Sequence, residues 1–263
     1  MTKRITSGAL SLPSAIVIAA ALIAIAIIFI NKPTNTDGTG INRPGENSNK
    51  PAASVGIAPV TIDDHILGNP NAPIKLIEYS DLSCPYCKLF NPTLEQIMNT
   101  YGPTGKVAWI YRHFPLFKPV DGTIPHPNSL LQAEALECSA KLGGNTSFFA
   151  FEKKWFEIFP DDGAGRNATL DREVIDNVAR NVGLDPVSFN DCLSSGRFKS
   201  KIEKAYDDGL KAGITGTPLT IIVTPSGNQI PLVGSQTYSI LKTTIDTLIT
   251  TIPAGSATTT PAN

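Results

Sequence analysis

The sequence predicts an α/β domain whose sheet is interrupted by an all-helical insertion, preceded by one N-terminal transmembrane helix. A strand, helix and strand pattern covers residues 74–111, and strand patterns return only after residue 218. Strands and a helix of these lengths form a βαβ unit, in which the two strands pair in parallel. A long uncharged apolar stretch near the N-terminus predicts the membrane helix.

The first 30 residues have the pattern of a membrane anchor. No charged residue lies between Arg4 and Lys32, and residues 15–30 are an unbroken apolar run. A spanning helix needs roughly 17 to 25 residues, which residues 8–30 supply. A cleaved signal peptide is the alternative, but bulky residues rather than small ones follow the apolar core. We therefore expect an uncleaved anchor with the N-terminus inside.

Two polar segments flank the predicted domain. Residues 31–58 are rich in Asn, Thr, Gly, Pro and Ser and predict a disordered linker, and residues 254–263 predict a similar tail. The domain is therefore expected over residues 59–253. The chain holds 22 basic and 23 acidic residues, and the domain has no basic stretch suited to phosphates. Nucleic acid is therefore not an expected partner.

The first half of the domain supplies the βαβ unit. A strand is expected at residues 74–80, a helix at about 84–100 and a second strand at 107–111. The helix is expected because its apolar residues recur at helical spacing and form one face: Phe90, Leu94, Ile97, Met98 and Tyr101.

The insertion is expected between about residues 120 and 212. Its helices are predicted by successive apolar faces, by Asp185-Pro186 as a helix start, and by a last helix over about 198–212. The faces are Leu131, Ala135, Cys138 and Leu142; Phe148, Phe151, Trp155 and Phe159; and Val174, Ile175, Val178 and Val182.

The sheet resumes after the insertion. Residues 219–223 and 229–233 are expected to form a hairpin around a turn at 225–228. A closing helix is expected over residues 239–250, with four apolar residues facing inward: Ile240, Leu241, Ile245 and Leu248.

The strongest chemical signal is the sequence Cys84-Pro85-Tyr86-Cys87, where the first strand leads into the helix. A cysteine at a helix N-terminus faces free backbone N–H groups and the positive end of the dipole, so its thiolate is favoured. Proline is tolerated in the first helical turn. The spacing lets Cys87 close a disulfide with Cys84. We expect Cys84 to attack a substrate disulfide and Cys87 to resolve the mixed disulfide.

A zinc site is the alternative use of these cysteines. Structural zinc usually takes a second C-x-x-C or a paired His, whereas Cys138 and Cys192 stand alone and the three histidines are scattered. The sequence therefore favours redox chemistry with no metal and no cofactor. We expect His113 to be a packed residue at a strand end, and His65 and His126 to be surface or loop residues.

Two further candidates are Glu78 and the pair Thr217-Pro218. A carboxyl group buried beneath a dithiol would have a raised pKa and could relay a proton, and the alternative is that Glu78 faces solvent at a strand end. Thr217-Pro218 directly precedes a strand. A cis-proline there would expose the Thr217 backbone to an incoming substrate strand.

Taken together, these residues resemble the DsbA family of thioredoxin-fold oxidoreductases over about residues 60–250. The resemblance rests on the segment Glu78 to Cys87, on Pro92, on the segment Tyr111 to Leu116 and on Thr217-Pro218. Plain thioredoxins place the proline much sooner after the cysteines. Here 131 positions separate the two (218 minus 87), which leaves room for inserted helices.

The resemblance implies a thioredoxin-like fold with Cys84 as nucleophile, Cys87 as resolving residue and Pro218 as a cis-proline. Substrate contacts are expected at Pro85, Tyr86, Thr217 and Pro218. Some similar proteins join two insertion helices by a structural disulfide, which implies a Cys138–Cys192 pair worth roughly 3 to 4 kcal/mol. Two buried free thiols are the alternative. The implied substrates are unfolded or reduced secreted proteins, and a membrane partner would reoxidise the dithiol.

The expected function is therefore disulfide introduction by a monomer on the extracytoplasmic side of the cell membrane. An isomerase or reductase is an alternative, although residues 31–58 are too short and polar for an N-terminal dimerisation domain. A second alternative is a redox-inert module that binds client proteins, but the intact Cys84 and Cys87 make it less favoured. A metallochaperone would need soft ligands near the thiolates, and Met98 is better explained by core packing.

Overall fold

The computed structural model describes residues 56–158 and 172–251. The predicted anchor, nearly all of the linker, Phe159 and the tail at 254–263 lie outside the described residues. Within the described ranges, no helix combines the length and the apolar character needed to cross a membrane.

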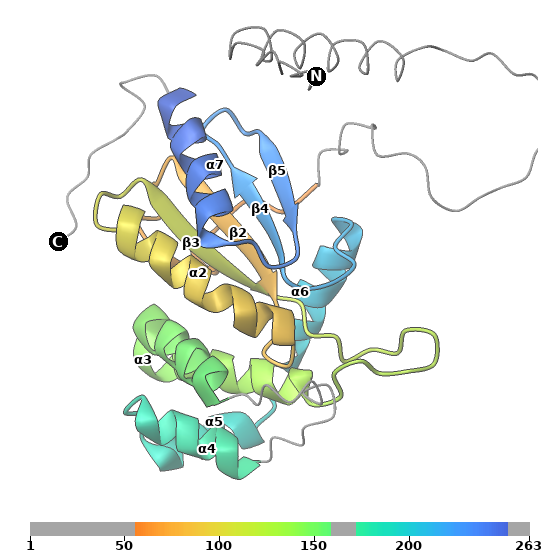
Figure 1. Ribbon diagram of the computed structural model, residues 1–263. Helices are drawn as coiled ribbons and strands as arrows, with labels where there is room; N and C mark the ends of the chain where they lie inside the picture. The colour runs from red at the N-terminus through yellow and green to blue at the C-terminus, as the bar shows by residue number, and fades with distance from the viewer. Residues whose placement is uncertain (1–55, 159–171, 252–263) are drawn as a thin grey trace, which may run out of the picture. The chain divides into compact units, whose positions relative to one another are not determined.

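Five strands form one sheet in the order β1-β3-β2-β4-β5 (Figure 1). β2 and β3 are parallel, as the βαβ pattern predicts, and place Glu78 beside Tyr111. The other neighbouring pairs are antiparallel. The strands are β1 (His65–Gly68), β2 (Ile74–Ser80), β3 (Val107–His113), β4 (Leu219–Val223) and β5 (Gln229–Val233).

Helices cover both faces of the sheet. α2 (Pro85–Tyr101) and α7 (Tyr238–Thr251) pack on one face, and α6 (Lys199–Lys211) lies on the other (Figure 1). Successive strand residues point to opposite faces, so β2 sends Leu76 toward α2 and α7 and Ile77 toward α6. Gly209 lets α6 approach closely, because an added Cβ there would lie 2.7 Å from the Phe114 ring.

The insertion is helical, as expected, and consists of α3 (Ser129–Ile158), α4 (Arg172–Asn181), α5 (Pro186–Ser194) and α6. Non-helical backbone at Gly143 and Gly144 divides α3 into two segments. A disulfide joins Cys138 of α3 to Cys192 of α5, with their Cα atoms 5.8 Å apart. This is the pairing that the family resemblance implied.

Two residues expected to face inward are exposed. Leu142 is 39% exposed, because the first segment of α3 stops beside it. Ile240 is 52% exposed, whereas Leu241 and Ile245 are fully buried. Consecutive residues lie about 100° apart around a helix, so the stripe that contacts the sheet leaves Ile240 outside.

Candidate active site

Cys84 and Cys87 are free, buried thiols at the N-terminal end of α2. Cys84 is the N-cap residue and Pro85 occupies the first turn, so the Cys84 side chain stands at the positive end of the helix. Asp81 holds the turn that leads into the helix. Its carboxylate accepts a hydrogen bond from the Ser83 N–H at 2.8 Å, and its carbonyl accepts one from the Cys84 N–H at 3.0 Å.

Thr217, which follows the helical insertion in the chain, contacts Cys84. The Cys84 thiol donates a hydrogen bond to the Thr217 carbonyl oxygen at 3.4 Å. The Thr217–Pro218 peptide bond is cis. The strand order explains the encounter, because β4 pairs directly with β2 and so returns Thr217 to the start of α2.

The two thiols have opposite acidities. A hydrogen bond from the Cys87 side chain lowers the pKa of Cys84 to about 6 against the effect of burial, and the Thr217 side chain lowers it further. Burial, followed by the hydrogen bond with Cys84 and the nearby negative charges, raises the pKa of Cys87 well above its ordinary range. The arrangement therefore favours a Cys84 thiolate that accepts a hydrogen bond from a Cys87 thiol.

Glu78 is buried beneath the dithiol and does not face solvent. Its side chain is 1% exposed, and Trp109 donates its ring N–H to Oε2 at 3.0 Å. Burial raises the pKa of Glu78 to about 7; the Trp109 hydrogen bond opposes this rise, and negative charge on Cys84 adds to it. A carboxyl group with that pKa can gain or lose a proton near neutral pH.

Glu152 on α3 is a second buried carboxyl group, which the sequence reasoning missed. It is 1% exposed, and its Oε1 has no hydrogen-bond partner among the described residues. Burial, and then the charge of Glu78, raise its pKa well above the ordinary range. It borders a cavity of about 270 Å³ together with Trp109 and Asn91. Its position on the helical stripe of Phe148 and Trp155 is a signal that could have revealed it.

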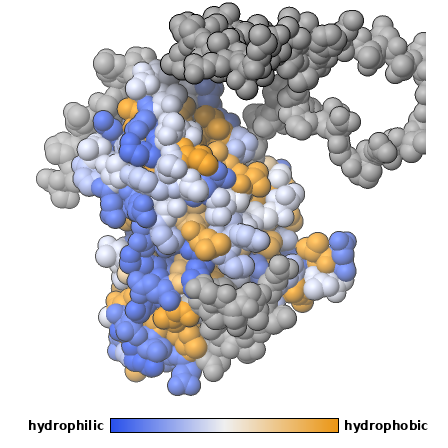
Figure 2. Space-filling view, viewed as in Figure 1, coloured by the Kyte–Doolittle hydropathy of each residue, from blue (hydrophilic) through white to orange (hydrophobic). Residues whose placement is uncertain are grey.

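The loop between β3 and α3 is anchored beside the dithiol. Asp81 Oδ2 accepts the Leu116 N–H at 2.8 Å and lies 2.6 Å from His126 Nδ1. His126 is in a loop, as expected, but it is only 5% exposed. Between these anchors the loop projects and carries exposed Val120 and Ile124; Figure 2 shows apolar residues gathered on it.

The predicted substrate contacts differ in their exposure to solvent. Tyr86 is 57% exposed on the first turn of α2, and Leu89 on the next turn is 64% exposed. Pro85 and Thr217 are half-buried, and Pro218 is buried.

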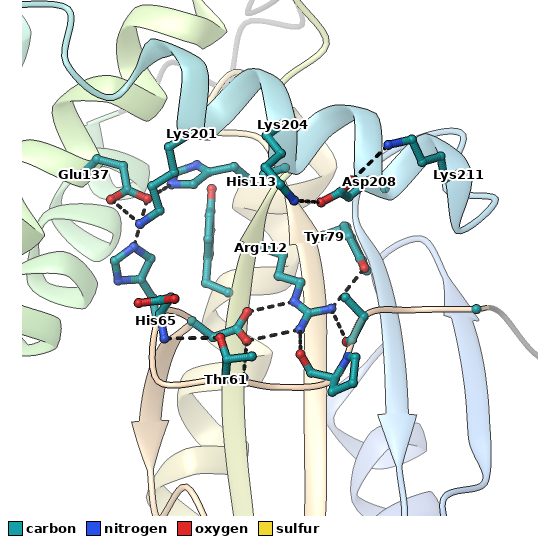
Figure 3. Close-up of a pocket in the computed structure, with 18 residues that line it drawn as sticks. Thr61, His65, Tyr79, Arg112, His113, Glu137, Lys201, Lys204, Asp208 and Lys211 are labelled. Atoms are coloured by element: carbon teal, nitrogen blue, oxygen red, sulfur yellow. Dashed lines mark hydrogen bonds and ion pairs between the residues drawn. The ribbon is translucent and has the colours of Figure 1, made fainter.

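The structure brings two of the scattered histidines together. His65 of β1 and His113 of β3 both contact Glu137 of α3 (Figure 3). The expectation that His65 lies at the surface or in a loop is wrong: it is a strand residue, 9% exposed, and stacks on Phe148. His113 is packed at the end of its strand, as expected.

Comparisons with known proteins extend over most of the domain. The family model described as Thioredoxin matches residues 60–247. The structure of alpha-DsbA1 from Wolbachia pipientis aligns with a TM-score of 0.61 at 26% identity and covers 74% of this chain and 96% of that chain. The Probable disulfide bond formation protein D of Bacillus anthracis is 26% identical over 183 residues, which are 68% of this chain and 76% of that protein.

A membrane transporter also contains a related segment. The Na(+)/H(+) antiporter NhaA 3 of Salinispora tropica is 30% identical over 163 residues, which are 62% of this chain and 22% of the antiporter. This chain thus spans less than a quarter of the length of that relative.

Proposed function

Because this chain belongs to the thioredoxin family, among its DsbA-like members, we propose that it is an extracytoplasmic thiol:disulfide oxidoreductase that introduces disulfide bonds into secreted or surface proteins. The observation that carries the proposal is the opposite acidity of the two thiols, with the pKa of Cys84 lowered to about 6 and that of Cys87 raised. Such a pair supplies one good leaving thiolate and one proton-holding thiol.

The reaction begins with the disulfide between Cys84 and Cys87. A substrate thiolate attacks Cys84 Sγ and forms a mixed disulfide, while the Cys87 sulfur leaves with the bonding electrons and takes up a proton. A second substrate thiolate then attacks the substrate sulfur and releases the Cys84 thiolate. The substrate loses two electrons and two protons overall, and the enzyme pair gains the two electrons.

Oxidation of substrates is favoured because the released thiolate is stable. At pH 7 a thiol with a pKa of about 6 is mostly ionised. One pKa unit below the working pH stabilises the reduced enzyme by about 1.4 kcal/mol, or about 30 mV for this two-electron couple. The low pKa thus makes the pair a stronger oxidant than an unperturbed dithiol.

Glu78 is proposed to supply the proton that Cys87 takes up when its sulfur leaves. Its pKa of about 7 matches the working pH, and the charge of Cys84 affects it directly. Glu152 extends the buried carboxyl pair toward the 270 Å³ cavity, which offers the proton a route to solvent.

Unfolded chains are the proposed substrates, because exposed apolar side chains lie on the first turns of α2 and the Thr217 backbone lies beside Cys84. Tyr86 and Leu89 are exposed beside the thiol, and the projecting loop adds Val120 and Ile124. The Thr217 backbone beside Cys84 suits an extended segment that adds as a strand. Both features would favour flexible, apolar substrate segments rather than one particular substrate sequence.

The membrane anchor at residues 1–30 and a membrane partner that reoxidises the dithiol remain part of this proposal. The apolar run at residues 15–30 supports the anchor. A flexible linker over residues 31–58 would give the domain a reach of roughly 30 Å from the membrane. The domain would act as a monomer at that surface.

The reduction potential of the Cys84–Cys87 pair tests the direction of the reaction. The full-length chain is equilibrated in glutathione buffers, and the two thiols are counted by the alkylation mass shift while Cys138 and Cys192 stay paired. We expect a value near about −120 mV, as for DsbA. A value near about −270 mV, as for thioredoxin, would identify a reductase and overturn the oxidase proposal.

A further inference from the structure

We propose that His65, His113 and Glu137 form a binding site for a divalent metal ion of the zinc class, outside the dithiol site. The three residues come from β1, β3 and α3, so a bound ion would link the sheet to the helical insertion (Figure 3). The proposal does not depend on the redox activity and assigns these residues a function of their own.

The donor atoms of the three residues are gathered closely enough to converge on one ion. His65 Nε2 and His113 Nε2 lie 3.0 Å and 3.1 Å from the same atom, Glu137 Oε1. One donor atom from each residue lies within 4.8 Å of the others. A tetrahedral ion with bonds of about 2.0 to 2.1 Å separates its donors by roughly 3.3 Å, so zinc binding would draw the donor atoms together by up to about 1.5 Å. Two imidazoles and one carboxylate are a ligand set that zinc takes with water as the fourth ligand.

Asn145 orients the His65 ring for metal binding. The Asn145 side-chain N–H₂ donates to the Ile66 carbonyl at 3.1 Å, which directs its oxygen at His65 Nδ1, 3.1 Å away. Because that oxygen only accepts, Nδ1 carries a hydrogen. A neutral ring then directs the Nε2 lone pair at the Glu137 carboxylate, and a cation between the two acceptors resolves the conflict. An outer hydrogen bond of this kind is usual for metal-binding histidines.

Lys201 holds the other oxygen of Glu137 and leaves Oε1 to the proposed ion. Its Nζ lies 2.7 Å from Oε2, and its side chain is 44% exposed. A cavity of about 780 Å³ is lined by His65, His113, Glu137 and Lys201 and gives room for entry and for a water ligand. The ammonium group opposes a dication, so its removal should strengthen binding.

The alternative is a metal-free network in which a protonated imidazole and Lys201 neutralise Glu137. That network places a protonated imidazole and an ammonium group around one carboxylate. The two histidines are 9% and 4% exposed, so a positive charge on either ring carries a desolvation cost. The two interpretations differ in one observable, the uptake of metal.

The test uses the full-length chain with a tag free of histidine and with Cys84 and Cys87 oxidised, so that thiolates cannot bind the ion. Calorimetry with Zn²⁺ should give one site per chain. Co²⁺ should give visible bands of a four-coordinate ion without a thiolate charge-transfer band. Absence of saturable binding, or a thiolate band, would overturn the proposal.

Variants locate the site. Asn145→Ala, at an exposed position, should weaken Zn²⁺ binding by roughly 10-fold to 100-fold. Lys201→Met should strengthen it, and Glu137→Gln should abolish it. Glu134→Gln, one turn earlier on α3, is the matched control and should leave the affinity unchanged. Because Asn145 and Lys201 are accessible, their variants test the site even if Glu137→Gln fails to fold. Equal binding by the Asn145, Lys201 and control variants would place the ion elsewhere and refute the site.

Discussion

Two glutamates of this protein are equally buried but have opposite surroundings. Glu78 and Glu137 are 1% and 2% exposed. Burial raises the pKa of Glu78 to about 7, because hydrogen bonds with Ser80 and Trp109 only partly oppose the effect of burial and the charge of Cys84 adds to it. Burial acts on Glu137 in the same way, but hydrogen bonds with His113 and His65 hold its pKa well below the ordinary range. The hydrogen-bond partners, rather than depth, therefore decide which carboxyl group keeps its charge.

Removal of the partnered charge should cause the largest loss of stability. We expect Glu137→Gln to lower the unfolding free energy by roughly 2 to 3 kcal/mol in metal-free buffer, because His65, His113 and the partly exposed Lys201 lose a charged hydrogen-bond acceptor. Denaturant unfolding measures the change. Glu134→Gln on the same helix is the control, with an expected change within about 1 kcal/mol. A similarly small change for Glu137→Gln would contradict the comparison.

The same substitution at Glu78 should have the opposite sign. A rise in pKa from 4.5 to about 7 means that the charged form destabilises the fold. The penalty is complete above pH 7 and absent below pH 4.5, and full relief would be about 3 kcal/mol. We expect Glu78→Gln to stabilise the reduced protein by about 2 kcal/mol at pH 8, with the gain shrinking as the pH falls through this window. A destabilised variant at pH 8 would show that the hydrogen bond from Trp109 outweighs the cost of burying the charged carboxylate.

The Glu78 substitution should at the same time slow catalysis. Without the carboxyl group, protonation of the departing Cys87 sulfur depends on solvent, and we expect disulfide transfer to a reduced substrate to slow roughly 100-fold at pH 7. Stopped-flow tryptophan fluorescence follows the reaction. An unchanged rate in a folded variant would exclude the relay.

A smaller effect is expected when the hydrogen bond that sets the pKa of Cys84 is removed. Its alkylation rate in the reduced protein should rise with pH and reach half its maximum near pH 6, because only the thiolate reacts. Cys87→Ala removes the hydrogen bond that lowers this pKa, so the midpoint should move upward by at least about one pH unit. Coincident profiles for the two proteins would show that another group sets the acidity.

The smallest effect is expected at Glu152. Burial raises the pKa of Glu152 well above its ordinary range and so favours the neutral form, which Glu152→Gln replaces with another neutral group. The pKa of Glu78, followed by the NMR shift of its carboxyl carbon, should change by less than about half a unit. A fall of more than one unit would mean that Glu152 carries the charge and that the roles of the two carboxyl groups are reversed.

Local patterns in the sequence were sufficient to predict most of the fold. The largely apolar run of β2 and the apolar stripe of α2 are each recognisable within a few residues, and the dithiol motif lies between them. β1 was missed because four residues at a sheet edge are too few to show a period. The helix break at Gly143 and Gly144 was also missed. It follows Leu142 directly, so the last residue of the predicted apolar face lies at a helix end and is exposed.

The candidate sites were predictable to the extent that they depend on neighbours in the chain. Cys84 and Cys87 form a local motif, and Glu78 belongs to the strand that precedes them. The meeting of His65, His113 and Glu137 depends on pairing between β1 and β3 and on the packing of α3, across separations of 24 and 72 positions. Glu152 also lies on α3, and its proximity to Glu78 of β2 again depends on tertiary packing. Such contacts follow from tertiary structure and leave no spacing to detect.

The position of the insertion in the chain has a consequence for the order of assembly. Thr217, which lowers the pKa of Cys84, lies 133 positions after it in the chain. Both Cys138 and Cys192 lie between them. Chains are made from the N-terminus, and contacts of long sequence separation form late. A chain still under synthesis therefore carries a dithiol helix without its full activating environment. In the proposed oxidase, the dithiol therefore gains its full activating environment only after both cysteines of the Cys138–Cys192 disulfide have been made.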